Sequence, residues 1–483
     1  MPKPRAVWVF GVDAPRFDPD GPPDPRRAAI EHLLTRGLVE EDSTGRVLPV
    51  AAARIEVSND SLLYTFHLRP GLRFTDGSPC RSGVFRDALR AGLLRSDHST
   101  RRWQLAAIRG VDAIRAGRPL PALGIEAPDS LTLTLRLDVP DRRLLNRLAL
   151  PGTTDAWSRR EATGWASVSG LGPLAVLQAD STRGMVLVRA RSAVPRADLA
   201  DTISVRFVPS AARVRSLMRS GTPDLVWPLP VGLLSEPVPS AYRRVAHAAR
   251  PERWLLLVMR ADLPPTTRLP VRHALGHGIN RPGIIRLLAG QASEVGAWIP
   301  GAPSFDFPRL DPQEIELWRE RGKLGRSFHV DMAYDANGAA AEIARSLQGE
   351  WASHAIYVEL MPVTGSRRRD QFLNGRAHLV LADVQELDTD PAGLLATLVM
   401  PVRGPAVGPL RSGWRTRDLD PWLYAGRRAT PWDPGWVERR LEEERIALPL
   451  ARLPWVWLER AAGPMAPVHP RFGPECPTPS VLR

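Results

Sequence analysis

The sequence predicts an α/β protein built from at least two lobes. The chain has 483 residues, of which 43% are hydrophobic, and this length exceeds what a single hydrophobic core usually supports. Strand-like and helix-like segments alternate through much of the second half, which is typical of α/β folds. One of these segments, residues 253–262, is a continuous apolar run and predicts a strand that is buried on both faces.

The first half of the chain contains both helix and strand patterns. A short apolar run at residues 6–12 predicts a first strand. A proline-rich loop at residues 18–27 leads into a helix expected over residues 26–38, where leucine and isoleucine recur at helical spacing. Further on, residues 128–140 alternate as a strand does, and residues 141–150 are expected to form a short helix.

The stretch "YTFHLRPGLRFTDGSPC", residues 64–80, predicts a strand followed by two turns. Tyr64, Phe66 and Leu68 alternate with polar residues, so they share one face of a strand. Pro70-Gly71 ends that strand, and Asp76-Gly77 turns the chain again. The unit is a hairpin that packs on a core.

The second half supplies the remaining elements of the α/β pattern. Residues 270–290 predict two helices with a break at Pro282. Residues 340–363 predict a helix followed by a strand, and residues 378–384 predict another strand. Near the end, residues 436–460 predict a helix that leads into strand-like segments.

The charge of the chain is strongly positive, at +13, yet it does not predict a nucleic-acid partner. Only Lys3 and Lys323 are lysines, and the arginines are spread along the whole chain. A protein that reads nucleic acid concentrates its positive charge in one stripe or element. We therefore expect a solvated arginine-rich surface and no nucleic-acid partner.

Membrane and redox signals are weak. No stretch approaches the roughly 18 apolar residues of a membrane-spanning helix. The basic start and short apolar run at residues 6–12 lack a small-residue cleavage site, so no signal peptide is visible. Cys80 and Cys476 permit one disulfide without implying it, and two cysteines cannot build a four-cysteine zinc site.

Two motifs match known chemistry only loosely. His273 and His277 have the spacing of a zinc protease helix, but Ala274 stands where the catalytic glutamate is needed, so ordinary helix surface or core is expected. The segment "GLGPLA", residues 170–175, weakly fits a dinucleotide loop, but Pro173 stands where the helix should open. We expect no metal site, no cofactor and no catalytic residues.

An acidic group follows the strand expected at residues 378–384. Glu386, Asp388 and Asp390 could hold a metal or a ligand ammonium there, or form a solvated loop, and the pattern leaves both readings open. The fifteen tryptophans offer stacking surfaces, although most are expected in the core.

The order of these segments resembles the family-5 extracellular solute-binding proteins of ABC importers. The motifs that carry the resemblance run from about residue 17 to residue 450. Residues 57–80 match the family's most recognisable segment at Tyr64, Thr65, Phe66, Leu68, Arg69, Gly71, Phe74, Asp76, Gly77 and Pro79. In the family's order, the remaining matches are "FDPDGP", "EHLLTRGLVEED", "AIRGVDAIRAG", "SGLGPL", "LMRSGTPDLV" and "RLPVRHALGHGINRPGI".

The resemblance implies a two-lobed α/β fold of the periplasmic-binding-protein type II, in its large peptide-binding subclass, with a ligand cleft between the lobes. Lobe one would comprise residues 1–250, including an inserted subdomain at about 50–160. Lobe two would comprise residues 251–447, and residues 448–483 would return to lobe one. The chain is then expected to cross between lobes near residues 254–260 and 448–453.

The resemblance also implies which loops line the cleft. They carry the expected ligand-binding residues Asp20, Gly21, Pro23, Gly170, Gly172, Pro173, Glu386, Asp388 and Trp414. In peptide binders an aspartate four residues before a proline holds the ligand's amino terminus. Counted back from Pro391, that place is Leu387, and Asp388 is one residue later, so either the loop is shifted by one residue or the ammonium anchor is lost. With a shifted loop, we expect Asp388 to act as the ammonium partner. Trp414 is expected to be a stacking wall.

The function implied is the substrate-binding component of an ABC importer, which captures short peptides or a similar solute by hinge closure. The expected partners are that solute and the permease subunits, with a monomer as the working form and a periplasmic or cell-surface location. The alternative is a cytoplasmic small-molecule sensor with the same fold and a non-peptide ligand.

Overall fold

The computed structural model describes most of the chain. The described residues are 5–11, 17, 25–42, 46–94, 104–115, 122–141, 143–150, 152–158, 164–180, 184–190, 200–208, 210–234, 236–247, 253–288, 291–297, 299, 302–304, 307–335, 339–363, 377–385, 412–414, 418, 433–461, 468–469 and 473–474.

A seven-stranded mixed sheet forms the centre of lobe one. Its strands lie in the order β12 (Tyr242–His247), β18 (Trp455–Arg460), β11 (Leu225–Trp227), β1 (Arg5–Phe10), β10 (Thr202–Phe207), β9 (Gly184–Arg189) and β8 (Leu174–Asp180). The first strand of the chain runs parallel to both of its neighbours, β10 and β11, so it lies inside the sheet. The strand predicted near residue 6 is therefore confirmed.

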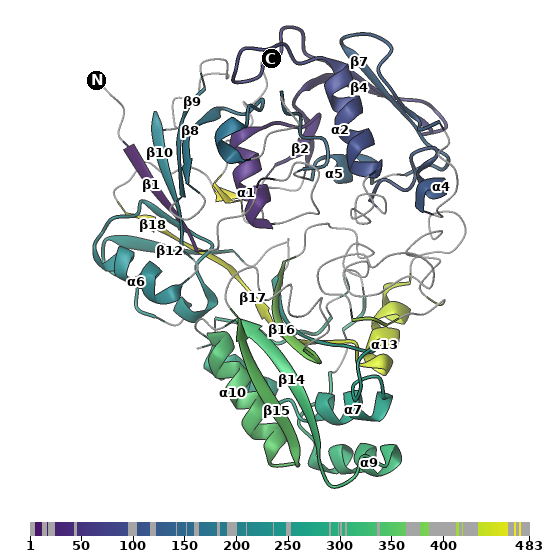
Figure 1. Cartoon of the computed structure of the whole chain (residues 1–483), viewed down its shortest axis with the longest axis vertical. Helices are drawn as coiled ribbons and strands as arrows, with labels where there is room; N and C mark the ends of the chain where they lie inside the picture. The colour runs from purple at the N-terminus through teal and green to yellow at the C-terminus, as the bar shows by residue number, and fades with distance from the viewer. Residues whose placement is uncertain are drawn as a thin grey trace.

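A four-stranded antiparallel sheet forms a second layer in the upper part of the molecule (Figure 1). Its strands lie in the order β4 (Ala52–Val57), β5 (Leu63–Leu68), β7 (Thr132–Arg136) and β6 (Ile125–Glu126). Tyr64, Phe66 and Leu68 point into its core, together with Phe85 and Leu89 of α2 (Ser82–Leu94). The alternation read in the hairpin is confirmed.

A five-stranded sheet forms lobe two, at the bottom of Figure 1. Its strands lie in the order β15 (Ile356–Val363), β14 (Phe328–Asp335), β16 (Leu379–Gln385), β13 (Arg253–Met259) and β17 (Ala447–Leu453). Every residue of β13 is buried, and its alternate side chains enter two different hydrophobic clusters. The prediction of a strand buried on both faces is confirmed.

Helices and short strands complete the two lobes. In lobe one they are α1 (Pro25–Leu34), α4 (Val111–Arg115), α5 (Leu144–Leu148), α6 (Ala211–Arg219), the 3-10 helices η1 (Trp165–Ser167) and η2 (Val231–Leu233), and the pairs β2 (Val39–Glu41) with β3 (Val47–Pro49) and β19 (Val468–His469) with β20 (Gly473–Pro474). In lobe two they are α7 (Leu269–His277), α8 (Arg281–Leu287), α9 (Pro312–Gly322), α10 (Ala339–Ala352) and α13 (Pro434–Glu444).

The helix predicted over residues 26–38 is shorter than expected, because α1 ends at Leu34. Beyond it, Val50 and Ala52 donate their backbone N–H groups to the carbonyl of Leu38. The backbone near Leu38 is therefore paired with the segment around residue 51, although the spacing of its apolar residues predicted a helix there. The break in residues 270–290 falls before Asn280, which caps α8, and Pro282 lies in the first turn of α8, where proline is tolerated.

The chain passes between the two large sheets twice. Strand β12 belongs to the seven-stranded sheet and β13 to the five-stranded sheet, and β17 and β18 make the reverse passage across Pro454. The expected domain boundary at residue 448, where the chain would return to lobe one, stays a prediction. In the sheet pairings, residues 447–453 lie with β13 in lobe two.

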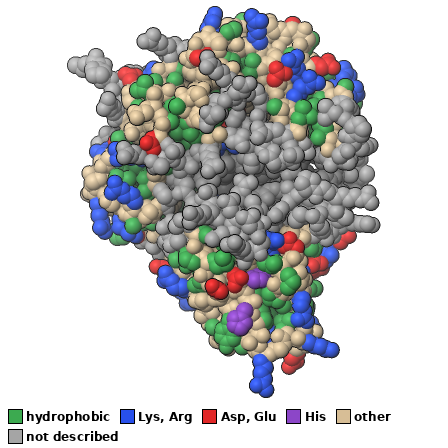
Figure 2. Space-filling view, viewed as in Figure 1, with side chains coloured by type: hydrophobic (Ala, Val, Ile, Leu, Met, Phe, Trp, Pro, Cys, Tyr) green, Lys and Arg blue, Asp and Glu red, His purple; other side chains and the backbone are tan. Residues whose placement is uncertain are grey.

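Basic side chains are distributed over both lobes on the face that Figure 2 shows, in small groups between acidic ones. Within the described residues, none of the helices has the length and apolar character that crossing a membrane requires.

Candidate functional site

The expected ligand-binding residues fall into two groups. Asp20, Gly21, Pro23, Glu386 and Asp388 lie outside the described residues, so their roles stay predictions. Gly170, Gly172, Pro173 and Trp414 are described. The three in the 170–173 segment belong to lobe one, and Trp414 packs in the core of lobe two.

The 170–173 segment lies against the end of α1. Gly172 donates its backbone N–H to the carbonyl of Leu34 at 2.9 Å. A Cβ on Gly172 would come within 2.6 Å of that carbonyl oxygen, and one on Gly170 would come within 2.8 Å of the Thr35 Cβ. Both positions therefore require glycine for this close approach. After Pro173 the chain enters strand β8 and not a helix, so the dinucleotide reading of this segment is excluded.

The Asp76-Gly77 turn of the hairpin is attached to the same segment. Thr75 donates its N–H to the Gly170 carbonyl at 3.0 Å, and the N–H of Asp76 reaches the Ser169 hydroxyl at 2.9 Å. The Ser158 hydroxyl in turn donates to the Asp76 carboxylate at 2.6 Å. The turn therefore joins the layer of the four-stranded sheet to the loop that precedes β8.

The Asp76 carboxylate is held in its ionised form. Burial alone would raise its pKa, but hydrogen bonds from Ser158, Ser78 and Ser169 outweigh burial and lower the pKa below its usual value. Sequence reasoning recognised the turn and missed these partners, because Ser158 and Ser169 are more than 80 residues away in the chain.

Trp414 lies in the core of lobe two, with 8% of its surface exposed. The guanidinium carbon of Arg440, on α13, lies 5.8 Å from the centroid of its ring. The preceding Gly413 has a φ of 73° and packs directly on the carboxylate of Asp262. In this conformation the indole stacks on a cation of the protein, and its role as a wall for a ligand stays a prediction.

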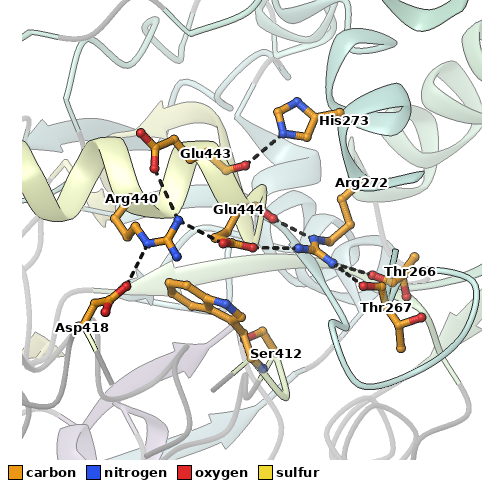
Figure 3. Close-up of polar contacts among 10 residues, drawn as sticks. Thr266, Thr267, Arg272, His273, Ser412, Asp418, Arg440, Glu443 and Glu444 are labelled. Carbon is orange, nitrogen blue, oxygen red and sulfur yellow. Dashed lines mark hydrogen bonds and ion pairs between the residues drawn. The ribbon is translucent and has the colours of Figure 1, made fainter. Parts of the chain in front are cut away.

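Arg440 also ties the loop around Trp414 to α13. Its Nε lies 3.4 Å from the carboxylate of Asp418, and its Nη1 lies 3.0 Å from that of Glu444 (Figure 3). Glu444 pairs at 3.0 Å with Arg272 of α7, which is almost fully buried. One chain of charges therefore connects the loop, α13 and α7.

The histidine pair on α7 belongs to this structural network. The Nε2 of His273 lies 2.9 Å from the Glu443 carbonyl, as Figure 3 shows, and its ring stacks on Trp318 with centroids 3.9 Å apart. In the part of the chain that the structure describes, no group of three or more His, Cys, Asp or Glu side chains is arranged to hold a metal ion. The expectation of ordinary helix packing at His273 is confirmed.

One of the two cysteines, Cys80, lies in the core beside the four-stranded sheet. Cys80 is buried, carries a free thiol and packs with Phe74 and Phe85. Its burial raises the pKa of the thiol to about 12. Cys476 lies outside the described residues.

Comparison with known protein families gives one match over most of the chain. Residues 46–404 match the family described as bacterial extracellular solute-binding proteins, family 5. A glutathione-binding protein of Pectobacterium atrosepticum is 24% identical over 379 residues, which are 75% of this chain and 70% of that protein. A di/tripeptide-binding protein of Pseudomonas aeruginosa is 35% identical over 130 residues, which are 26% of this chain and 24% of that protein.

Solved structures share the whole fold. The murein tripeptide-binding protein of Escherichia coli superposes with a TM-score of 0.83 and 19% identity, over 98% of this chain and 97% of that one. A periplasmic binding protein from Agrobacterium tumefaciens in complex with agropinic acid superposes with a TM-score of 0.80 and 18% identity, over 95% of this chain and 94% of that one. At these identities the superpositions show the fold, which is the two-lobed substrate-binding fold that the resemblance implied.

Proposed function

Because the chain belongs to the bacterial extracellular solute-binding proteins of family 5, we propose that it is the substrate-binding component of an ABC importer that captures short peptides or a peptide-like solute. The family match over residues 46–404 carries this proposal. The extracellular character of the family favours it over a cytoplasmic sensor, and supports a periplasmic or cell-surface location with permease subunits as partners. We assign no catalytic step to the chain.

Relatives support peptides as the ligand class. One curated relative is named for di- and tripeptides, and a Helicobacter pylori relative of known structure was solved with the peptide STSA, at a TM-score of 0.81 and 16% identity over 98% of this chain and 97% of that one. Agropinic acid and glutathione, which other relatives bind, are also small and carry carboxylates. A peptide in the cleft would lie extended and pair through its main chain, which gives affinity without fixing its sequence.

We propose that both lobes contribute residues to the ligand site. Lobe one would contribute Asp20, Gly21, Pro23 and the 170–173 segment, and lobe two would contribute Trp414, Glu386 and Asp388. Strand β16 ends at Gln385, so the acidic group starts directly after a strand of the lobe-two sheet. Asp388 would bind the ligand's ammonium through a charge-assisted hydrogen bond.

Titration calorimetry with free and N-acetylated tripeptides tests this proposal. Acetylation removes the ammonium, and Asp388→Asn removes its partner, so each should weaken binding by about 10- to 100-fold, the value of a hydrogen bond between charged groups. Asp87→Asn is the matched control, because its carboxylate is exposed and pairs with the neighbouring Arg86 on α2, away from every residue proposed to touch the ligand. Equal binding of free and acetylated peptides would refute the role of Asp388, and no binding of any peptide would refute peptides as the ligand.

A further inference from the structure

The strands that enter and leave the two passages between the lobes are paired with one another. In the lobe-one sheet, β12 pairs antiparallel with β18, and His247 lies opposite Trp455. In the lobe-two sheet, β13 pairs antiparallel with β17, and Arg253 lies opposite Leu453. Only Pro454 separates β17 from β18, so relative motion of the lobes must be absorbed by very few residues at this place.

Arg253 is the first residue of β13, and its side chain contacts both lobes. Its Nε donates to the carboxylate of Asp383 at 2.8 Å, and its Nη2 donates to the second oxygen of the same carboxylate. Asp383 lies on β16, in lobe two, opposite Leu255. The guanidinium carbon also lies 5.4 Å from the ring centroid of Trp455, the first residue of β18 in lobe one.

This arrangement uses properties that only arginine has. A planar guanidinium can bind a carboxylate along its edge while its face stacks on an indole. The Arg253 side chain is only 6% exposed, and its buried Nη1 has no hydrogen-bond partner among the described residues. Such a buried donor is costly, so packing at the junction must hold the group in place.

Trp455 carries the contact into the centre of lobe one. Its ring is parallel to that of Trp227 on β11, at 5° and a centroid distance of 6.3 Å. Trp227 meets Phe10 of β1 edge to face at 5.6 Å. The face on which Arg253 lies is therefore held by aromatic contacts across three neighbouring strands of the lobe-one sheet, so it is fixed to the centre of that lobe.

We propose that Arg253 is a positioning residue for ligand capture. Through Trp455 it sets the orientation of the lobes, and through Asp383 it holds the end of strand β16, three residues before the predicted ligand loop begins at Glu386. This inference rests on the proposed function only where it speaks of a ligand. The mechanical link between the lobes is independent of what the protein binds.

Small-angle X-ray scattering of the unliganded protein tests the link. Arg253→Lys keeps a positive charge but loses the two-pronged pair and the stacking face, so the lobes should separate and the radius of gyration should rise above that of the wild type. Trp455→Phe keeps an aromatic face, so its radius of gyration should fall between those of the wild type and Arg253→Lys. The matched control is Arg319→Lys, which replaces an arginine that is 11% exposed and bonds only within lobe two.

Binding of a tripeptide pool adds a second readout. Arg253→Lys should weaken the apparent affinity by about tenfold, because less of the protein occupies the competent orientation. A radius unchanged from the wild type, with a melting temperature lowered as in Arg319→Lys, would show that Arg253 only packs, and would overturn the proposal. If the wild type binds no peptide, the proposed function fails, while the scattering result still decides the role of Arg253.

Discussion

Protonation of His273 should destabilise the protein as the pH falls below 6.5. The ring is buried, its Nδ1 has no hydrogen-bond partner in the part of the chain that the structure describes, and its neighbours include the cations Arg445 and Arg272. Burial is the largest cause and Arg445 the next, and together they lower the pKa of His273 from 6.5 to about 4, although the contact with the Glu443 carbonyl opposes them. The same two causes lower the pKa of His277.

The sign follows from proton uptake. Between pH 6.5 and pH 4 the unfolded chain has His273 protonated and the folded protein does not, so acid favours the unfolded state. The stability is fully present above pH 6.5 and is lost as the pH falls toward 4. With a shift of about 2.5 units, the loss amounts to about 2 kcal/mol at pH 5 and about 3 kcal/mol at pH 4.

Urea unfolding of the wild type and of His273→Gln, measured from pH 7.5 to pH 4.5, checks this value. Glutamine can still donate an amide N–H toward Glu443 but does not titrate, so the variant should lose about 2 kcal/mol less than the wild type between pH 7 and pH 5. His329→Gln, at an exposed position of β14, is the control. Parallel pH profiles for the wild type and His273→Gln would refute the reasoning.

Three further outcomes follow from packing and charge. In the same urea assay, Gly172→Ala should lower the free energy of unfolding by about 1–3 kcal/mol, because its Cβ would overlap the Leu34 carbonyl. Gly349→Ala is the control: Gly349 lies within α10 with open space around it, so alanine should raise the free energy of unfolding by up to about 1 kcal/mol. The Cys80 thiol, with a pKa near 12, should resist iodoacetamide at pH 8 until urea unfolds the protein, as peptide mapping would show; rapid labelling in the folded protein would contradict its burial. Arg440→Met should leave the fold intact and increase hydrogen exchange at residues 412–414, because it removes the cation over Trp414 and the pair with Asp418; unchanged exchange would show that Arg440 does not hold this loop.

Local pattern was enough to predict several of the individual elements. The unbroken apolar run at residues 254–259 and the alternation of Tyr64, Phe66 and Leu68 predicted the right strands, because strands buried on two faces are apolar throughout and strands buried on one face alternate. The order of the segments along the chain then carried the family resemblance, and the resemblance implied the two-lobed fold that the structural matches show.

Long-range contacts were beyond the same reasoning. Helix α1 ends at Leu34 beside a glycine more than 130 residues away, and Asp76 binds serines that no local pattern connects to it. Arg253 looked like the edge of an apolar run, and its contacts with Asp383 and Trp455 exist only once two sheets meet. Trp414 was expected to face a ligand. Its contact with Arg440 could not be predicted from the sequence, because it depends on where α13 packs in the fold.

Native mass spectrometry of the gently purified protein, followed by denaturation to identify what is released, shows whether this chain carries peptides. We expect a mixture of short peptides, with Asp388→Asn retaining less of it. Release of one defined non-peptide, such as a sugar, an opine or a metal chelate, would contradict peptides as the substrate class. An empty protein that also shows no thermal shift with peptide pools would contradict its role as a peptide-binding component of an importer.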